Sequence, residues 1–209
     1  MLYLVRSTYS RSHRHSKVWV NMLLAISVSL MVPALQAQQS STIIGGESFA
    51  SDCYHRSQSA AVSRSASRLD IEVCDRAVLD GGLVKSKLAA SYTNRGVIYM
   101  AMEDLTKAYK DYEKALKIDG TLAEAYLNRG NLWFAVQKFE NAISDYDKAL
   151  HYGTSKVEIA FLNRGLAREN IGELVLAKND YQSSLTARPE WQPALDKLER
   201  VNGKLMKSK

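Results

Sequence analysis

The chain has 209 residues, of which 46% are hydrophobic and 24% are charged, a composition that is ordinary for a soluble globular protein and sufficient for one domain. Its formal charge of +6 would favour nucleic acid as a partner, but four of the basic residues lie within residues 1–37, a segment that contains no acid. The remainder is nearly balanced, so composition gives little support to nucleic-acid binding.

Residues 1–37 have the organisation of a secretory signal peptide. A basic start ends at Lys17, the segment Val18–Val32 is mainly apolar, Pro33 breaks it, and residues 35–37 form a small-residue cleavage site. The alternative is an uncleaved membrane anchor, but a spanning helix needs about 20 apolar residues and this run is shorter and interrupted. We therefore expect an exported protein, periplasmic or secreted, with no membrane attachment after cleavage.

Residues 38–51 are small and polar and include Gly45-Gly46, so we expect a flexible linker there. Residues 52–82 follow as a weakly patterned helical segment that contains the two cysteines of the chain, Cys53 and Cys74. In an exported protein such a pair favours a disulfide over a metal site, since two thiols without nearby histidines cannot complete a zinc shell. Two buried free thiols are the alternative if the chain is not exported.

A unit of about 34 residues occurs three times after residue 83, at spacings of 34 and then 35 residues. Each copy contains an aromatic residue, then Asn-Arg-Gly, and later an alanine, an aspartate and a tyrosine. The apolar residues recur at three- and four-residue steps on both sides of a break, which predicts two amphipathic helices per copy. The predicted helices span residues 84–101 and 104–118, 122–136 and 139–151, and 157–171 and 173–187.

This period and this order of aromatic and small residues resemble the tetratricopeptide repeat. The resemblance implies an all-α, right-handed solenoid of antiparallel helix pairs, with repeats at residues 83–122, 123–157 and 158–189. It also implies that residues 52–82 are a degenerate leading repeat, in which Cys74 takes the place of a tyrosine. One more amphipathic stripe, at residues 190–203, is expected to be a capping helix that ends at Gly203, before a basic tail at residues 204–209.

The repeated small residues predict close helix packing within each pair. A glycine inside a helix costs about 1 kcal/mol relative to alanine, so its recurrence needs a reason, and close approach of the paired helix supplies one. The large tyrosine of the second helix then fills the space that the small residues leave. The predicted packing residues are Gly96, Gly130, Gly165, Ala108, Ala142, Ala177, Tyr112, Tyr146 and Tyr181.

An arginine and an aspartate recur sixteen residues apart in each repeat, on facing positions of the predicted pair. They could form a basic stripe for a ligand, but internal ion pairs are favoured because such a pair satisfies itself. The predicted pairs are Arg95 with Asp111, Arg129 with Asp145, and Arg164 with Asp180.

The asparagine before each arginine is turned toward the inner, concave face that the resemblance assigns to the first helices. Such side chains can hold the backbone of an extended peptide, or they can simply make helix-capping and solvent contacts, and the sequence leaves both readings open. The predicted peptide-binding residues on this face are Asn94, Asn128, Asn163, Leu127, Asn131, Phe134, Leu162 and Leu166.

The carboxylate clamp with which some members of this family bind chaperone tails is mostly absent. Of the five positions that it requires, only Asn128 matches, so a partner segment of mixed apolar and polar character is expected instead.

No catalytic or metal-binding pattern stands out in the sequence. His55 and His151 lack metal-ligand spacing, and there is no phosphate-binding loop or nucleophile motif. We therefore predict a non-enzymatic protein without a cofactor, which binds another protein or a peptide segment as an interaction module or scaffold. The alternative is an accessory or inhibitory subunit that docks by its outer faces onto an envelope enzyme or assembly. The sequence does not indicate an oligomeric state.

Overall fold

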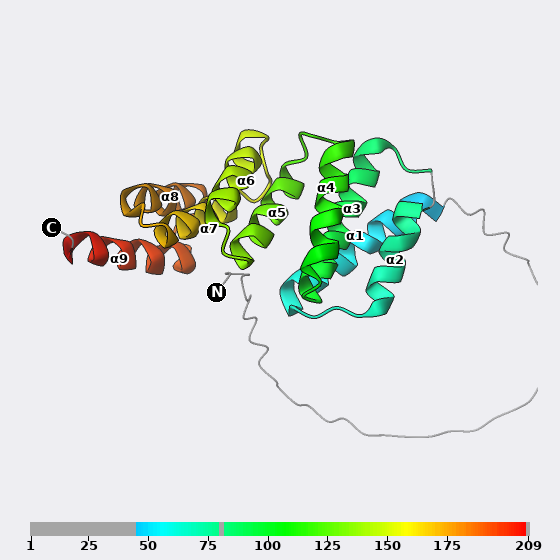
Figure 1. Ribbon diagram of the computed structural model, residues 1–209, viewed down its shortest axis with the longest axis horizontal. Coiled ribbons are helices and arrows are strands. Elements are labelled where there is room, and N and C mark those ends of the chain that lie inside the picture. The colour runs from blue at the N-terminus through cyan, green and yellow to red at the C-terminus, as the bar shows by residue number, and fades with distance from the viewer. Residues whose placement is uncertain (1–44, 80–81, 208–209) are drawn as a thin grey trace, which may run out of the picture. The chain divides into compact units, whose positions relative to one another are not determined.

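The structure, a computed structural model, describes residues 45–79 and 82–207, and the elements of this part of the chain are all helices (Figure 1). The predicted signal peptide, residues 1–37, lies outside the described residues, as do residues 38–44 of the predicted linker. The helices are α1 (Gly45–Ser63), α2 (Arg68–Leu79), α3 (Lys85–Ala101), α4 (Leu105–Ile118), α5 (Ala123–Ala135), α6 (Phe139–His151), α7 (Val157–Asn170), α8 (Leu174–Ala187) and α9 (Gln192–Lys207).

Consecutive helices pack as pairs, α3 with α4, α5 with α6, and α7 with α8. The first helix of each pair also packs against both helices of the pair before it, so that α5 contacts α3 and α4. The hairpin of α1 and α2 stands in the same relation to α3, as a leading pair. These described residues confirm the predicted all-α repeat solenoid, in which each pair buries its apolar faces against its neighbours.

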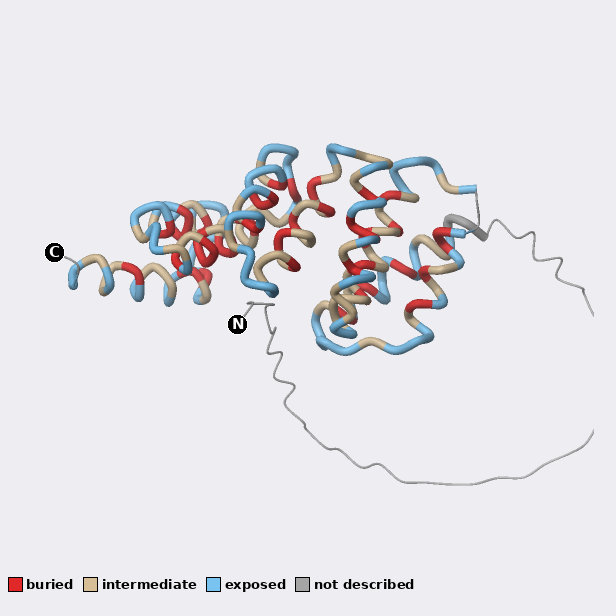
Figure 2. Tube along the Cα trace, in the orientation of Figure 1, coloured by how far each residue is buried: buried red, intermediate tan, exposed pale blue. Residues whose placement is uncertain are grey.

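Close contact between a glycine and a tyrosine fixes each of the three repeated pairs. A Cβ atom added to Gly130 would lie 2.6 Å from the Tyr146 ring, and the corresponding distances are 2.5 Å for Gly96 and Tyr112 and 2.7 Å for Gly165 and Tyr181. Only a residue without a side chain leaves room for the ring. The tyrosines are at most 1% exposed, and the buried residues lie where helices face one another (Figure 2).

The leading pair is joined by a disulfide between Cys53 of α1 and Cys74 of α2. Both cysteines are fully buried, and among residues 48–63 of α1 the other buried residues are Ser57 and Ala60. Asp70, which replaces the packing alanine of the other repeats, caps α2 by accepting hydrogen bonds from the amide and hydroxyl of Ser67 at 2.8 and 2.7 Å. Capping accounts for the acid at this position.

Two predicted boundaries were wrong. Helix α1 begins at Gly45, so the last part of the expected linker, residues 45–51, is helical. Its burial against α2 and α3 outweighs the low helix propensity of two glycines. Gly203 does not end the capping helix, which continues to Lys207, because one glycine inside a helix costs only about 1 kcal/mol.

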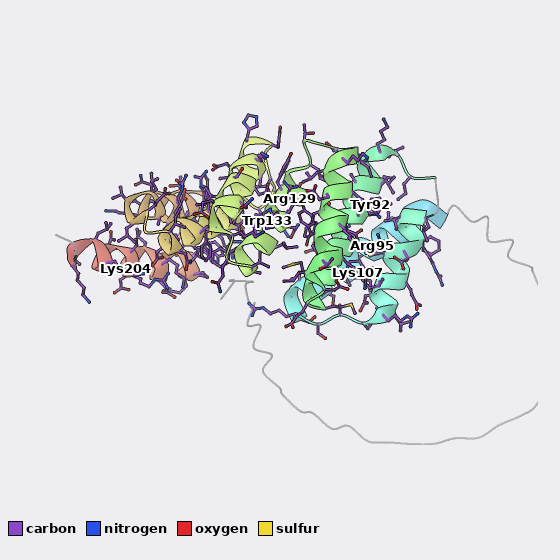
Figure 3. The ribbon with its side chains drawn as sticks, in the orientation of Figure 1. Tyr92, Arg95, Lys107, Arg129, Trp133 and Lys204 are labelled. Atoms are coloured by element: carbon purple, nitrogen blue, oxygen red, sulfur yellow. A yellow bond between two sulfur atoms is a disulfide. The ribbon has the colours of Figure 1, made fainter. Side chains whose placement is uncertain are left out.

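Helix α9 covers the last repeat, as a capping helix should. Trp191, Ala194 and Val201 are buried in one cluster with the apolar residues of α7 and α8. Glu169 of α7 accepts hydrogen bonds from the side chains of Arg200 and Lys204 of α9, at 2.7 and 2.8 Å; Lys204 is labelled in Figure 3.

The Glu169 side chain is only 3% exposed. It also accepts a hydrogen bond from the Tyr181 hydroxyl at 2.6 Å. Burial alone would raise the pKa of Glu169, but the bonds from Arg200, Lys204 and Tyr181 lower it below its ordinary value. Helix α9 is thus attached by charge as well as by apolar contact.

Within the described ranges, no helix combines the length and the apolar character that crossing a membrane requires. The same residues contain no group of three histidine, cysteine or acidic side chains that could hold a metal ion.

Candidate functional site

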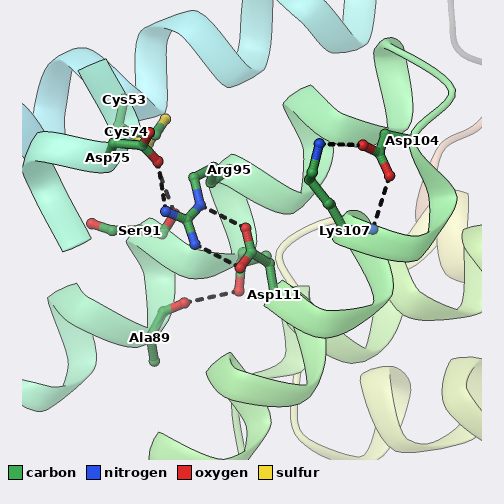
Figure 4. Close-up of polar contacts among 10 residues, drawn as sticks. Cys53, Cys74, Asp75, Ala89, Ser91, Arg95, Asp104, Lys107 and Asp111 are labelled. Carbon is green, nitrogen blue, oxygen red and sulfur yellow. Dashed lines mark hydrogen bonds and ion pairs between the residues drawn. A yellow bond between two sulfur atoms is a disulfide. The ribbon is translucent and has the colours of Figure 1, made fainter. Parts of the chain in front are cut away.

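The repeated arginines lie across the seams between neighbouring helices. Arg95 donates two hydrogen bonds to Asp111 of its own pair, both at 2.7 Å, and a third to Asp75 of α2, also at 2.7 Å (Figure 4). Burial alone would lower the pKa of Arg95, but the hydrogen bonds and charges of Asp111 and Asp75 raise it above its ordinary value. The guanidinium therefore stays charged and paired.

The later repeats place their arginines in the same way. Arg129 binds Asp145 through two bonds, at 2.7 and 2.8 Å, and also Glu113 of the preceding pair. Arg164 binds Asp180 at 2.6 Å and Asp147 of the preceding pair at 2.5 Å. Each arginine thus joins its own helix pair to the one before it, and Figure 3 labels two of them on successive repeats, Arg95 and Arg129. The sequence had indicated the first partner of each arginine but not the second.

A groove of about 510 Å³ opens beside the first helices of the pairs. Helices α1, α3, α5 and α7 all contribute to it, together with the turns after α1 and α3 and two residues of α4. The residues that line the groove are Ala60, Ala61, Arg64, Val97, Met100, Ala101, Glu103, Leu105, Tyr112, Asn128, Asn131, Ala135, Ile159 and Asn163. Its volume falls within the range of pockets that bind small molecules or short segments of chain, roughly 300 to 1,000 Å³.

The predicted asparagines have different surroundings. Asn128, Asn131 and Asn163 line the groove. Asn128 already donates to the backbone oxygen of Glu124 in its own helix, at 2.8 Å. Asn94 is not among the lining residues, because α1 lies over it and Ser57 donates a hydrogen bond to its side chain at 3.2 Å. The structure therefore does not bring Asn94 into the groove with the other three asparagines.

The predicted leucines do not line the groove either. Leu127, Leu162 and Leu166 are 3%, 0% and 5% exposed, and each belongs to an apolar cluster between helices. Phe134 is half-buried and packs edge-on against Phe139, with ring centroids 5.3 Å apart. A first helix in a repeat array contacts neighbours on several sides, so the three leucines are buried in the core, where a partner cannot reach them, and Phe134 is half-buried outside the groove lining.

The turn after each first helix contains one residue with left-handed backbone, and the turns after α1 and α3 border the groove. The residues are Arg64, Glu103, Gln137 and Gly172, with φ of 53°, 61°, 61° and 83°. Sequence reasoning missed Glu103, because an acid in a turn reads as solvent-exposed surface. It also missed Ala60, Ala61 and Arg64, because α1 carries few large apolar residues to mark its buried side.

Comparisons with known proteins agree with this geometry. A family model described as "Tetratricopeptide repeat" matches residues 89–122. The first repeat domain of Spaghetti (RPAP3), solved with the HSP90 peptide SRMEEVD, is similar over 60% of this chain and 99% of its own, with 27% identity and a TM-score of 0.56. The second repeat domain of human RPAP3, solved with the HSP70 peptide SGPTIEEVD, covers 57% of this chain and 98% of its own, with 27% identity and a TM-score of 0.53.

The repeat domain of Arabidopsis OM64 is also similar, with 25% identity, a TM-score of 0.55, and coverage of 58% of this chain and 99% of its own. No curated protein sequence matches the chain.

Proposed function

We propose that this chain, in which residues 89–122 match the tetratricopeptide-repeat family model, binds a segment of a partner protein in the groove of its first helices. The observation that supports this most directly is that one groove receives residues from four first helices, α1, α3, α5 and α7. Repeats give every first helix the same orientation, so residues far apart in sequence form one continuous surface. Two similar domains were solved with a peptide bound.

Substitutions at two exposed positions, one alanine and one serine, distinguish binding in the groove from docking by the outer faces. Ala135 lines the groove at the end of α5, whereas Ser144 is exposed on α6, the second helix of the same pair. Partners would be captured by cross-linking in the native host and their affinities measured by calorimetry. We expect Ala135→Arg to weaken binding at least tenfold, because a long charged side chain enters the groove, and Ser144→Arg to have no effect.

The reverse result would contradict the proposal. If Ser144→Arg weakens binding and Ala135→Arg does not, the partner docks on the second helices, as an accessory or inhibitory subunit would. Both positions are exposed, so neither substitution should lower the melting temperature, and circular dichroism checks this point.

We also propose that the chain is exported, with residues 1–37 removed. Two features support this proposal: the basic and apolar pattern of that segment, and the Cys53–Cys74 disulfide, since such bonds persist mainly in oxidising compartments. Mass spectrometry of non-reduced protein from the exported fraction is the test. An intact N-terminus would rule out cleavage, and free thiols would rule out the disulfide.

A further inference from the structure

The groove is mainly aliphatic, and its charges cancel. Alanine, valine, methionine, leucine and isoleucine side chains supply most of the lining, and the charged residues among them are one arginine, Arg64, and one glutamate, Glu103. An acidic segment would need several cations to offset the loss of its hydration, and this lining does not supply them. The lining is therefore complementary to an uncharged, apolar occupant.

One hydroxyl in the lining lacks the partner that its equivalents have. The Tyr146 hydroxyl donates to Asn131 at 2.9 Å, and the Tyr181 hydroxyl donates to Glu169 at 2.6 Å. The residues of α3 at the two corresponding positions are Val97, whose side chain has no polar atom, and Met100, whose thioether sulfur is only a weak acceptor.

The Tyr112 hydroxyl consequently has no hydrogen-bond partner among the described residues, although Tyr112 is only 1% exposed. Burial raises the pKa of Tyr112, so the hydroxyl keeps its proton and can donate.

A second polar atom of the lining is also without a partner. Asn163 is 2% exposed, and its Nδ2 donates to Oδ1 of Asn131 at 2.9 Å. Because Asn131 Oδ1 also accepts from Tyr146, this network fixes the orientation of the Asn163 amide. The Oδ1 atom of Asn163 is then buried with no hydrogen-bond donor. A buried acceptor without a donor is costly, so such a site favours a ligand that supplies one.

We propose that the groove selects an uncharged, aliphatic stretch of a partner's chain, whose backbone carbonyl accepts from Tyr112 and whose backbone amide donates to Asn163. A main chain carries one donor and one acceptor per residue, which matches an unpaired donor and an unpaired acceptor in one apolar groove. The inference rests on the proposed function and specifies its partner: an internal segment, not an acidic C-terminus.

A library of capped heptapeptides tests the selectivity. The three central positions would be drawn from aliphatic, acidic, basic or small hydroxyl residues, with the acidic peptide SRMEEVD and its free carboxylate as the comparison. With the full oxidised chain, we expect enrichment of peptides with aliphatic centres. Preference for SRMEEVD or for acidic centres would overturn the inference, and so would binding no stronger than that of the hydroxyl-centred peptides.

Two tyrosine substitutions separate binding from stability. Tyr112→Phe keeps the ring beneath Gly96 and removes only the unpaired hydroxyl. It should therefore lower the affinity for the selected peptide about fivefold without lowering the melting temperature. Tyr181→Phe is the matched control, since it removes a hydroxyl that is bonded inside the protein and lies outside the groove lining. It should lower the melting temperature and leave affinity unchanged.

An asparagine pair on α7 repeats the comparison. Asn163→Ala should lower the affinity for the peptide by a similar factor. Asn170 is exposed and its amide donates to the backbone oxygen of Leu166 in its own helix, so Asn170→Ala should leave the affinity unchanged.

The two levels of the proposal fail differently. If Ala135→Arg abolishes peptide binding but Tyr112→Phe and Asn163→Ala leave it unchanged, the groove binds peptides and the assigned hydrogen bonds are wrong. If none of the three substitutions affects a bound peptide, the groove is not the site and the proposed function fails.

Discussion

The two carboxylates that bind Arg129 should contribute very unequally to stability. Asp145 is 4% exposed and makes two bonds to the guanidinium, whereas Glu113 is 45% exposed. A hydrogen bond to a charged group contributes about 1.5 to 3 kcal/mol, but an exposed ion pair contributes about 0.2 to 1 kcal/mol after screening. We therefore expect a coupling free energy of about 2 to 3 kcal/mol for Arg129 with Asp145, and below about 1 kcal/mol for Arg129 with Glu113.

Two double-mutant cycles measured by urea unfolding would give these values. The first combines Arg129→Met with Asp145→Leu, and the second combines Arg129→Met with Glu113→Gln. Asp145→Leu alone should destabilise more than the double variant, because it leaves a half-buried guanidinium with only its exposed partner. Additive effects in the first cycle, or equal coupling in both, would refute the reasoning from burial. High salt should reduce only the second coupling.

Three further predictions concern packing, the disulfide and pH. Gly130→Ala should destabilise the fold by about 1 to 3 kcal/mol, because the new methyl group meets the paired tyrosine ring. Gly203→Ala should be neutral or stabilise by up to about 1 kcal/mol, because its new methyl group has no atom within 4 Å. Urea unfolding of both variants measures the two changes. Replacing Cys53 and Cys74 by serine should cost about 3 kcal/mol, and faster amide exchange should appear first in α1 and α2; uniform exchange would contradict this. Because the folded state lowers the pKa of Glu169, its stabilisation should be complete above its ordinary value of 4.5 and be lost as pH falls below it, so melting temperatures of wild type and Glu169→Gln should converge in acid.

The helix pairs could be predicted because the repeated small and large residues indicate which helices pack closely together. Gly130 and Tyr146 fit together only in a close antiparallel pair, and the predicted helix at residues 122–136 differs from α5 by one residue at each end. Helix α1 could not be recognised in this way. Its buried residues Cys53, Ser57 and Ala60 are small or weakly polar, so hydrophobic periodicity gives little signal.

The candidate site was harder to predict, because periodicity identifies a side of a helix and not its neighbour. Leu127 and Asn128 are adjacent, yet the first is buried in the core and the second lines the groove. Tyr112 has the same sequence pattern as Tyr146, and its unpaired hydroxyl follows from Val97 and Met100 on another helix. These differences in burial and in hydrogen-bond partners depend on which residues are in contact in the folded protein. They could therefore not be predicted from the sequence pattern alone.

The second partners of the arginines give the array a direction along the chain. Asp75, Glu113 and Asp147 occupy the same position in three successive second helices, and each binds the arginine of the repeat that follows. In α8 the residue at this position is Gln182, which carries no charge. In α9, the helix that follows, the position of the repeated arginine is occupied by Glu199, thirty-five residues after Arg164. The acid is present only where another repeat must be joined. A recombined chain could therefore gain an internal repeat by duplication without loss of these links, whereas growth beyond α8 would require an acid in place of Gln182.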